Sequence, residues 1–560
     1  ISLIFCSLIY NNHYPIFLFN LKGEICYNII MNNDYIKIME KINGNKYVKK
    51  TKKSLLSLVF SRAGVFIFLI LLQVGFMIYL YHYINIDVSL LIGGDTVLRI
   101  VIMLIILNMD SINPSYKNSW FMLIAIFPSL STAVFLLDHL SIGYKKEQKR
   151  VLDLEKVSRK LYNRDLSLVY DLKENDKELY NYQNYFYDLG GFVTYDKTST
   201  KYYPVGEDVF ADIIEAIRGA KDFIFIEIFI ISYGYMWGTI LEELVKKVEE
   251  GVEVRLLFDG TNSLVRVKSN FVEEMNSLGI KCKVFSPMIP IVSTYYNNRD
   301  HRKIFVIDNE YGFTGGINLA DEYINVYERF GHWKDCGLRL KGAAVESLTL
   351  MFLQMWSDSP DEVDSFARYL PKKSDSEGVG LCIPFSDSPM DDEYFAKNTI
   401  LTMLNNATDY VYFMTPYLIL EDEIINAITN ATKRGVDVRI CMPHIPDKKI
   451  AFALAKSHYV HLISNGVRIY EYTPGFCHSK VWLADDSSAF VGTINLDYRA
   501  IYLNFECGVM MKDTSAIGQI KEDFDVFLSI GSPISLEDAK NRSFITKAVG
   551  YVAKPFATLF

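Results

Sequence analysis

The 560-residue chain lacks any Cys-x-x-Cys pair among its eight cysteines, so their spacing predicts neither a zinc site nor a dithiol redox centre. It also lacks an excess of basic residues, since 66 acidic and 58 basic side chains give a formal net charge of −8. Nucleic-acid enzymes usually carry a positive field over the binding face. The charge balance therefore disfavours DNA or RNA as a partner, and the scattered thiols fit a reducing compartment.

The beginning of the chain lacks the basic segment and compact apolar run that a secretory signal requires. Residues 1–30 are apolar and rich in Asn and Tyr, with little periodicity. Met31 then opens a more ordinary polar stretch within the N-terminal region 1–62. We interpret 1–30 as sequence upstream of the native start. The alternative is an additional N-terminal hydrophobic segment.

Long apolar runs are concentrated in the region 63–140. Residues 63–81 contain 12 Leu, Ile, Val or Phe and one strongly polar side chain, Gln73, within 19 residues. That length suits a hydrocarbon core about 30 Å thick, and residues 120–137 are equally free of charge. We predict that both segments are transmembrane helices.

The middle apolar run, 88–107, contains Asp95 and Arg99. Each would cost about 2.5–3.5 kcal/mol at the centre of a bilayer, although their four-residue spacing lets them pair on one helical face. This segment spans the membrane, lies at its interface or packs on its neighbours. The region 63–140 therefore holds two or three transmembrane helices.

Flanking charge predicts the orientation of these helices. Several Lys and Arg residues precede residue 63 and follow residue 140, whereas the loop 82–96 has none. Basic flanks tend to stay on the cytoplasmic side, which requires an even number of spans. Two full spans satisfy this best, and they place everything after about residue 141 in the cytosol.

The rest of the chain consists of two similar halves, 150–365 and 375–550. In each half a strand-like segment precedes an amphipathic helical stretch, a glycine and a second strand-like segment. This alternation predicts an α/β fold with a sheet rich in parallel strands and helices outside it. The matching segments are 220–227, 241–250 and 251–257 in the first half and 407–414, 424–434 and 435–441 in the second, with further helices near 209–220 and 395–407 and a linker at 357–380.

The strongest signal is a duplicated His-x-Lys-x4-Asp motif, followed in both copies by Gly-x-x-Asn at the same distance. Residues two apart along a strand face the same side, so the His and Lys of each copy reach one pocket. The Asp, five residues after the Lys, falls on the opposite face, which favours a structural role in the following turn. The two copies comprise His301, Lys303, Asp308 and Asn318, and His478, Lys480, Asp485 and Asn495.

This set of side chains suits a phosphodiester, an anion that needs charge neutralisation, a nucleophile and a proton donor. A neutral imidazole can attack phosphorus while a protonated one gives its proton to the departing oxygen. Lys303 and Lys480 would hold the non-bridging oxygens, so neither a metal nor another cofactor is required. Asn318 and Asn495 would donate further hydrogen bonds. The alternative is two histidines that merely lie near strand ends, but matched spacing in two matched halves argues against it.

An imidazole in such a site needs an orienting carboxylate. Asp335 and Glu506 are the candidates, because both lie in largely apolar strands where an unpaired acid would be costly. We group them with Asn318 and Asn495 as residues that bind the substrate or lie beside it. The alternative is that each acid is an ordinary charge at a strand end.

The strings around the two motifs resemble bacterial cardiolipin synthases of the phospholipase D superfamily. They read HRKIFVIDNEYGFTGGINLADEY at 301–323 and HSKVWLADDSSAFVGTINLDYRAIYLNFE at 478–506. The resemblance covers about 110–550 and includes TPYL at 415–418. It implies two phospholipase D-type α/β halves that form one catalytic unit, preceded by transmembrane helices. It also implies a multi-pass protein of the bacterial cell membrane with cytoplasmic catalytic halves.

The resemblance further implies a reaction. A phosphatidyl group would pass from one phosphatidylglycerol to another, giving cardiolipin and glycerol through a phosphatidyl-histidine intermediate. The family pattern does not fix which histidine attacks, and we slightly prefer His301. Gly316 and Thr493 stand where many superfamily members have serine, as in the synthase branch, which weakens a nuclease interpretation. The competing interpretations are phospholipid hydrolysis, transfer to another alcohol, and a catalytically silent membrane scaffold. The implied active-site residues are His301, Lys303, Asp308, His478, Lys480 and Asp485, and the sequence predicts no particular oligomeric state.

Overall fold

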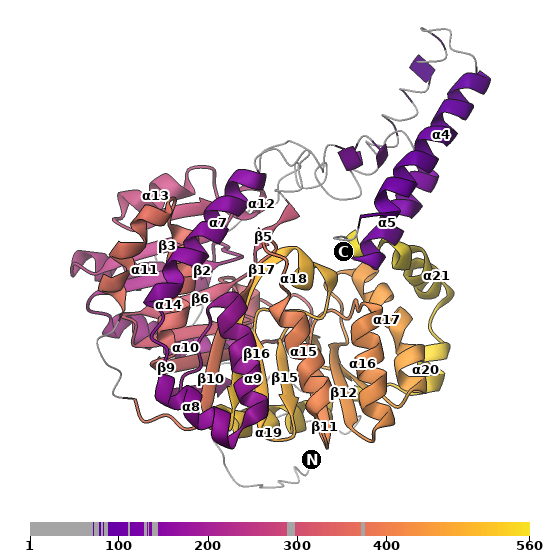
Figure 1. Cartoon of the computed structure of the whole chain (residues 1–560). Coiled ribbons are helices and arrows are strands. Elements are labelled where there is room, and N and C mark those ends of the chain that lie inside the picture. Colours follow the sequence, from indigo (N-terminus) through magenta and orange to yellow (C-terminus); the bar gives the residue numbers. More distant parts are fainter. Residues whose placement is uncertain are drawn as a thin grey trace, which may run out of the picture.

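Two α/β halves lie side by side in the structure, which is a computed structural model (Figure 1). The first half is magenta and pink in the figure, and the second is orange and yellow. Each half has a mixed β-sheet with helices packed on its faces. The structure describes residues 88–109, 113–127, 144–287, 297–370 and 376–559, together with isolated positions between 71 and 136.

The first half is built on a seven-stranded sheet in the order β1-β9-β7-β6-β2-β3-β4. Only β2, β3 and β4 pair in parallel, and the other neighbours are antiparallel. The strands are β1 (Thr198–Tyr203), β2 (Phe223–Ile228), β3 (Glu253–Asp259), β4 (Lys281–Phe285), β6 (Lys303–Ile307), β7 (Tyr311–Gly315) and β9 (Gly337–Gly342).

The second half repeats this arrangement in the order β10-β17-β16-β15-β11-β12-β13-β18. Parallel pairing is again limited to three neighbouring strands, β11, β12 and β13. The predicted predominance of parallel strands is therefore wrong, because the strand after each motif returns through a tight turn and pairs antiparallel. The strands are β10 (Leu381–Asp387), β11 (Tyr410–Met414), β12 (Asp437–Pro443), β13 (Arg468–Tyr472), β15 (Val481–Ala484), β16 (Ser488–Gly492), β17 (Asn504–Lys512) and β18 (Ser532–Pro533).

Four helices lie where the sequence predicts them. They are α10 (Gly206–Gly219), α11 (Tyr235–Glu249), α15 (Phe395–Asn406) and α16 (Asp422–Lys433). The predicted glycine stops follow α11 and α16, where Gly251 and Gly435 take φ values of 92° and 98° that favour a residue without a side chain. The local pattern therefore fixes both the helix and its end.

The remaining helices cover the sheets or lead into the two halves. The regular ones are α7 (Tyr144–Ser158), α8 (Leu166–Asn175), α9 (Lys177–Tyr185), α12 (Asn262–Val265), α13 (Phe271–Ser277), α17 (Lys449–Ser464), α18 (Tyr498–Tyr502), α19 (Ser515–Ile530), α20 (Leu536–Lys540) and α21 (Phe544–Ala553). Short 3-10 or π segments are η1 (Arg159–Leu161), η2 (Phe186–Gly190), η4 (Asp321–Ile324), η5 (Pro360–Tyr369) and η6 (Lys554–Leu559).

The two halves share a hydrophobic core. Helix α14 (Val345–Trp356) contacts β2, β6 and β7 of the first half and β10 of the second, and all of its residues are buried. One continuous cluster of buried side chains includes Phe225 of the first sheet and Phe385 of the second. The halves therefore form one packed unit, in which the shared core positions any site between them.

Two short strand pairings also join the halves. Strand β5 (Arg299–Asp300), from the first half, pairs in parallel with β17 of the second. Strand β14 (Gly475–Cys477), from the second half, pairs in parallel with β8 (His332–Lys334) of the first. Each crossing strand ends directly before a motif histidine.

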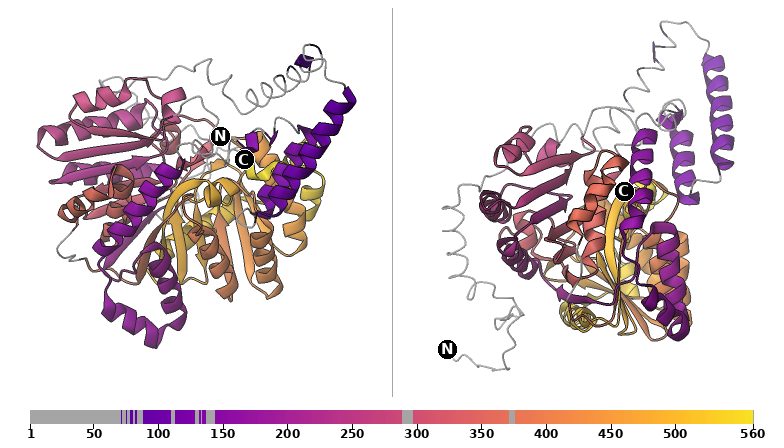
Figure 2. Two further views of the ribbon diagram at one scale, coloured as in Figure 1. Left: turned by 45° about the horizontal axis from the view of Figure 1, so that its top comes forward. Right: turned by 60° about the vertical axis from the view of Figure 1, so that its left-hand side comes forward.

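Of the two regular N-terminal helices in the described ranges, the first projects away from the halves (Figure 2), whereas the second packs on η6 of the second half. Helix α4 (Val88–Leu107) coincides with the predicted middle apolar run, and α5 (Pro114–Ile126) contains the start of the last one. Ile102 and Ile106 of α4 pack with Trp120 and Ile124 of α5. Within the described ranges, no helix has both the length and the apolar character needed to cross a bilayer. The predicted span 63–81 lies largely outside the described residues. The side chain of Asp95 lies outside them as well.

Candidate active site

Both motif histidines line one cavity of about 600 Å³ between the two halves. The structure therefore places the two imidazoles around a common space, as the sequence predicts. Asn318 and Asn495 line the same cavity. All four side chains belong to residues that are at least nine-tenths buried, so substrate groups that enter this space leave bulk water.

The backbone of each histidine is anchored by the opposite half. His301 follows β5, and its amide donates a hydrogen bond of 2.9 Å to the carbonyl oxygen of Phe505 on β17. His478 follows β14, and its amide donates at 2.7 Å to the carbonyl oxygen of Lys334 on β8. The two crossing strands thus deliver one histidine from each half to the boundary.

Each imidazole is held by a carboxylate of the other half. Nδ1 of His301 lies 2.9 Å from Oε2 of Glu506, and Nδ1 of His478 lies 2.8 Å from Oδ2 of Asp335. Both acids are fully buried. Such a bond fixes the ring orientation and leaves Nε2 as the nitrogen available to a substrate. The structure therefore brings Asp335 and Glu506 to the histidines that they were predicted to orient, and their grouping with the substrate-binding residues stays a prediction.

The surroundings of the two carboxylates differ. Asp335 accepts further hydrogen bonds from the amide of Cys336 at 2.9 Å and from Nε1 of Trp333 at 3.3 Å. Burial raises its pKa, but His478 and its hydrogen bond outweigh burial and hold the pKa below the usual value. Burial raises the pKa of Glu506 to about 7, although Lys303 opposes the shift. Asp335 is therefore the more firmly ionised partner.

The two motif lysines are buried beside the histidines. Nζ of Lys303 donates to the carbonyl oxygen of His301 at 2.6 Å, and Nζ of Lys480 donates to that of His478. Burial lowers the pKa of Lys303 to about 7 and also lowers that of Lys480. The charge of Lys480 also lowers the pKa of Lys303, so an anion between the two lysines would stabilise their ammonium forms, as expected of a phosphate-binding pair.

Burial also lowers the pKa of both histidines. The pKa of His478 falls to about 4, through burial and the neighbouring Lys480, although Asp335 opposes the shift. The pKa of His301 falls well below its ordinary value through burial, Lys303 and Lys480. A phosphodiester held between the lysines would offset their charge and raise both imidazole pKa values.

The two asparagines have different surroundings. Oδ1 of Asn318 accepts from the amide of Ile230 at 2.9 Å, and its Nδ2 donates to the hydroxyl of Tyr323 at 2.8 Å. Asn318 therefore ties two walls of the cavity together. Oδ1 of Asn495 is buried without a hydrogen-bond partner among the residues that the structure describes. Asn495 is thus the asparagine whose side chain has an unused polar atom in the cavity.

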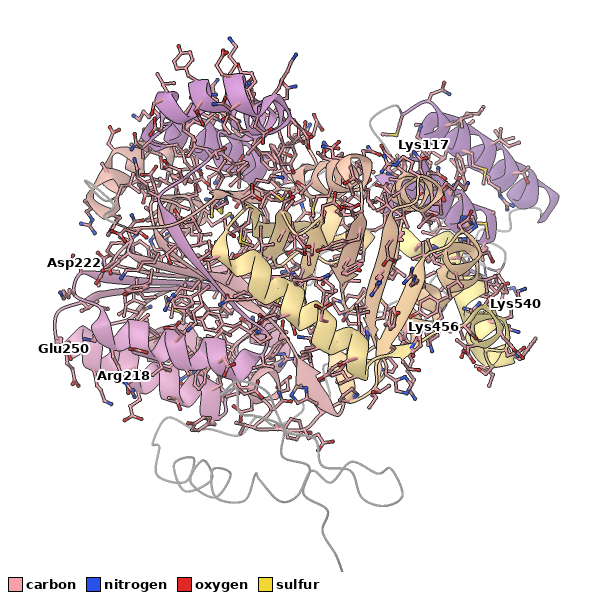
Figure 3. The ribbon with its side chains drawn as sticks, turned by 90° about the horizontal axis from the view of Figure 1, so that it is seen from below. Lys117, Arg218, Asp222, Glu250, Lys456 and Lys540 are labelled. Carbon is pink, nitrogen blue, oxygen red and sulfur yellow. The ribbon has the colours of Figure 1, made fainter. Side chains whose placement is uncertain are left out.

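The motif aspartates lie away from the cavity. Asp308 begins the turn after β6 with a φ of 53° and accepts hydrogen bonds from the amides of Lys221, Asp222 and Phe223 at 2.7–2.9 Å. Figure 3 shows Asp222 at the outer edge of the first half. The structure therefore does not bring Asp308 to the cavity, because its carboxylate holds the turn to the start of β2, and its implied place in the active-site set stays a prediction.

Asp485 does the same in the second half. It has a φ of 49° and accepts from the amides of Thr408, Asp409 and Tyr410 at 2.7–3.0 Å. The structure does not bring Asp485 to the cavity either, and its assignment as catalytic stays a prediction. Face parity along the strand already predicts a structural role, and the structure places both aspartates accordingly.

Asp485→Ala is expected to destabilise the fold by about 2 kcal/mol, because three backbone donors lose a charged acceptor. The detergent-solubilised protein should melt at a lower temperature and retain its specific activity below the transition. Asp409→Ala is the matched control, since this neighbouring side chain is exposed. Loss of activity with an unchanged melting temperature would contradict the structural assignment.

Sequence reasoning missed the aromatic walls of the cavity. The His478 ring lies 5.5 Å from the rings of both Tyr323 and Trp333, between centroids, and 5.8 Å from that of Phe476. The His301 ring has Phe229 at 4.8 Å. Most of these aromatic residues lie outside the two motifs and reach the site only through the fold, so motif spacing carries no signal for them.

Several solved and curated proteins resemble the chain. A structure of phosphatidylserine synthase from Haemophilus influenzae is 16% identical with a TM-score of 0.51, covers 66% of this chain and 94% of that protein, and supports the fold alone. An uncharacterised protein of Streptococcus mutans is 46% identical over 79% of this chain and 96% of its own length. Cardiolipin synthases of Alkalihalophilus pseudofirmus and Staphylococcus aureus are 31% and 30% identical, covering 81% and 83% of this chain and 90% and 95% of their own lengths.

Two α/β halves whose motif histidines line one cavity, each with a buried motif lysine two residues further on, define a phospholipase D-like enzyme. A family model described as "Cardiolipin synthase, PLD-like domain" matches residues 213–345 and 400–528, which contain both motifs. The chain therefore belongs to the cardiolipin synthase family.

Proposed function

We propose that the chain transfers a phosphatidyl group from one phosphatidylglycerol to a free glycerol hydroxyl of another, which yields cardiolipin and glycerol. The observation that carries this proposal is the shared cavity, where each half's imidazole is held by a buried carboxylate of the other half. Family membership supplies the substrate class, a phospholipid such as phosphatidylglycerol. The chain is accordingly a phosphatidyltransferase.

The first step forms a phosphatidyl-histidine. Nε2 of one imidazole attacks phosphorus, the bond from phosphorus to the glycerol oxygen breaks, and the other imidazole gives that oxygen a proton. Lys303 and Lys480 stabilise the charge on the non-bridging oxygens. Glycerol then leaves the cavity.

The second step regenerates the histidines. The hydroxyl of the acceptor lipid loses its proton to the imidazole that acted as the acid, and its oxygen attacks phosphorus. The bond between phosphorus and the nucleophilic imidazole then breaks. Water would compete with the acceptor at this stage, so burial of both histidine side chains favours transfer over hydrolysis.

The two carboxylates support different roles for the histidines. The more firmly ionised Asp335 stabilises the protonated form of His478, which suits a general acid. The raised pKa of Glu506 gives less support to a protonated His301, whose own pKa is strongly lowered. We therefore assign His301 as the nucleophile and His478 as the acid and base.

Incubation of purified protein with phosphatidylglycerol alone tests the function. Cardiolipin and glycerol in equal amounts are the expected products. If phosphatidic acid is the sole product, the protein is a hydrolase and not a transferase. If no lipid product forms, the protein is a catalytically silent scaffold.

The turnover number is expected to show a bell-shaped dependence on pH. Protonation of His301 removes the nucleophile at low pH, and deprotonation of His478 removes the acid at high pH. Because both imidazole pKa values are lowered in the protein alone, the bound phosphodiester must raise that of His478 before it can donate. The measurement is the rate of glycerol release from saturating lipid, and a flat profile from about pH 5 to 9 would contradict the assignment.

A location in the bacterial cell membrane is part of the proposal, with a multi-pass N-terminal region and both catalytic halves in the cytoplasm. Apolar side chains of α4 support it, since Val97, Ile100 and Leu104 are more than half exposed. The apolar run 63–81 and the basic flanks of the region add to this support. Protease added outside right-side-out membranes should spare residues 150–560, and digestion of that part would overturn the topology.

A further inference from the structure

We propose that Arg266 and Arg329 bind the phosphodiester of the acceptor lipid at the side of the catalytic cavity. The inference rests on the proposed function and adds a second anion site to it. The ligand is the phosphodiester monoanion of a glycerophospholipid whose free head-group hydroxyl attacks the phosphatidyl-histidine.

The reaction itself requires a second anion site. Both the donor and the acceptor carry a negatively charged phosphodiester, and in the product the two phosphates are separated by only one three-carbon glycerol bridge. In the proposed mechanism the first phosphate binds His301 and His478, which line the cavity, and the two motif lysines, which are hydrogen-bonded to the histidine carbonyl oxygens. Further cations are needed beside them, because two anions held so close together otherwise repel each other in a buried site.

Arg266 and Arg329 line the same cavity as the two histidines. They reach it from different elements, Arg266 directly after α12 and Arg329 in the loop between η4 and β8. Both side chains are partly exposed, at 27% and 41% of their full accessible surface. They therefore remain accessible to a ligand that enters from the mouth of the cavity.

The two guanidinium groups share a single carboxylate. Nη1 of Arg329 lies 2.7 Å from Oε1 of Glu322, and Nη1 of Arg266 lies 3.9 Å from the same oxygen while donating to Oγ of Ser232 at 2.7 Å. Two positive charges against one negative charge leave a net positive charge at this wall. Arginine is suited to phosphate because its planar donors can form paired hydrogen bonds with two oxygens.

The other cations of the cavity are balanced differently. Arg299 is buried, lies 3.6 Å from Asp259 and donates to the carbonyl oxygen of Ser286 at 3.1 Å. In the second half, Lys448 and Arg499 are accompanied by two carboxylates that also line the cavity, Asp447 and Asp497. Among the described residues of the cavity, the surplus of positive charge outside the motif lysines therefore lies at Arg266 and Arg329.

Adjacent residues link this wall to the catalytic centre. Tyr323, next to Glu322, accepts a hydrogen bond from Asn318 and has its ring centroid 5.5 Å from that of His478. An acceptor phosphate on the arginines would thus lie on the His478 side. That side is the one where the acceptor hydroxyl must give up its proton in the second step.

The experiment compares two acceptors in the same purified, full-length protein. Labelled glycerol is an uncharged acceptor that exchanges into phosphatidylglycerol, whereas phosphatidylglycerol is the anionic acceptor that yields cardiolipin. Arg266→Gln and Arg329→Gln should each lower cardiolipin formation about tenfold and leave labelled-glycerol exchange within about twofold of the unaltered protein. The phosphatidic acid to cardiolipin ratio should rise in parallel, because water then competes better with the acceptor.

Controls separate charge from folding. Each single variant leaves one arginine on Glu322, and Arg329→Lys should restore part of the cardiolipin yield by returning the charge. Arg218→Gln is the matched control, since Arg218 pairs with Glu243 at 2.9 Å and lies at the outer edge of the first half in Figure 3. Parallel loss of both reactions, or loss of neither, would overturn the acceptor site. An unaltered protein that makes no cardiolipin would instead refute the proposed function.

Discussion

His301→Ala is expected to abolish cardiolipin formation, with a loss of at least about 10,000-fold, while the protein still folds. The imidazole is the proposed nucleophile, and the second imidazole of the cavity, that of His478, is already needed as the acid. His478→Ala should cause a comparable loss with phosphatidylglycerol, because the glycerol oxygen must leave with a proton. Unchanged melting temperatures would establish that both variants fold.

A donor with a better leaving group separates the two roles. A phosphatidyl donor that carries p-nitrophenol in place of glycerol needs little protonation of the departing oxygen. With this donor, His478→Ala should release about one equivalent of p-nitrophenol and then stall at the phosphatidyl-enzyme. His301→Ala should release none. The reverse pattern would exchange the assignments, and full activity of either variant with phosphatidylglycerol would refute the shared cavity.

The parts of the fold that follow from the sequence depend on local pattern. Helices α11 and α16 are predictable because an amphipathic period ends at a glycine that adopts positive φ. The structural role of Asp308 is predictable from its position on the opposite strand face. These features need no knowledge of the distant parts of the chain.

The parts that escaped prediction depend on contacts between the halves. Strands β5 and β14 have two and three residues, too few for any periodicity, yet they decide where both histidines lie. Asp335 and Glu506 were candidate partners of the histidines. That each acid binds the histidine of the other half follows only from these crossing strands. Their sequence separations from the partners, 143 and 205 residues, lie far beyond any local pattern.

The mixed character of the sheets has a similar origin. Each half contains a strand–helix–strand repeat that correctly indicates parallel pairing of β2 with β3 and of β11 with β12. The strands after each motif carry no helix between them, so tight turns bring them back antiparallel. A parallel-rich sheet was thus an extrapolation from the part of each half that has helices.

Loss of either carboxylate that holds a histidine of the other half is expected to have the second large effect on activity. Asp335→Asn and Glu506→Gln are each expected to lower cardiolipin formation about 1,000-fold or more, because the amide cannot stabilise a charged imidazole and can favour the wrong tautomer. Both acids are fully buried and hydrogen-bonded, so these near-isosteric changes keep the packing. Glu346→Gln is a suitable control, since Glu346 is a buried acid of α14 that accepts from the amide of Asn163 at 2.8 Å and does not line the cavity.

The p-nitrophenyl donor separates the effects of the two carboxylates on the two steps of the reaction. Asp335 supports the proposed acid His478, so Asp335→Asn should leave the first release of p-nitrophenol nearly unchanged and slow only the second step. Glu506 orients the proposed nucleophile His301, so Glu506→Gln should slow the first release itself. Equal effects of the two variants on the first release would mean that the halves do not divide the work. Unequal effects on the first release would show that the two halves have different roles. Each half has a histidine held by a carboxylate of the other half, yet one histidine would act as the nucleophile and the other as the acid.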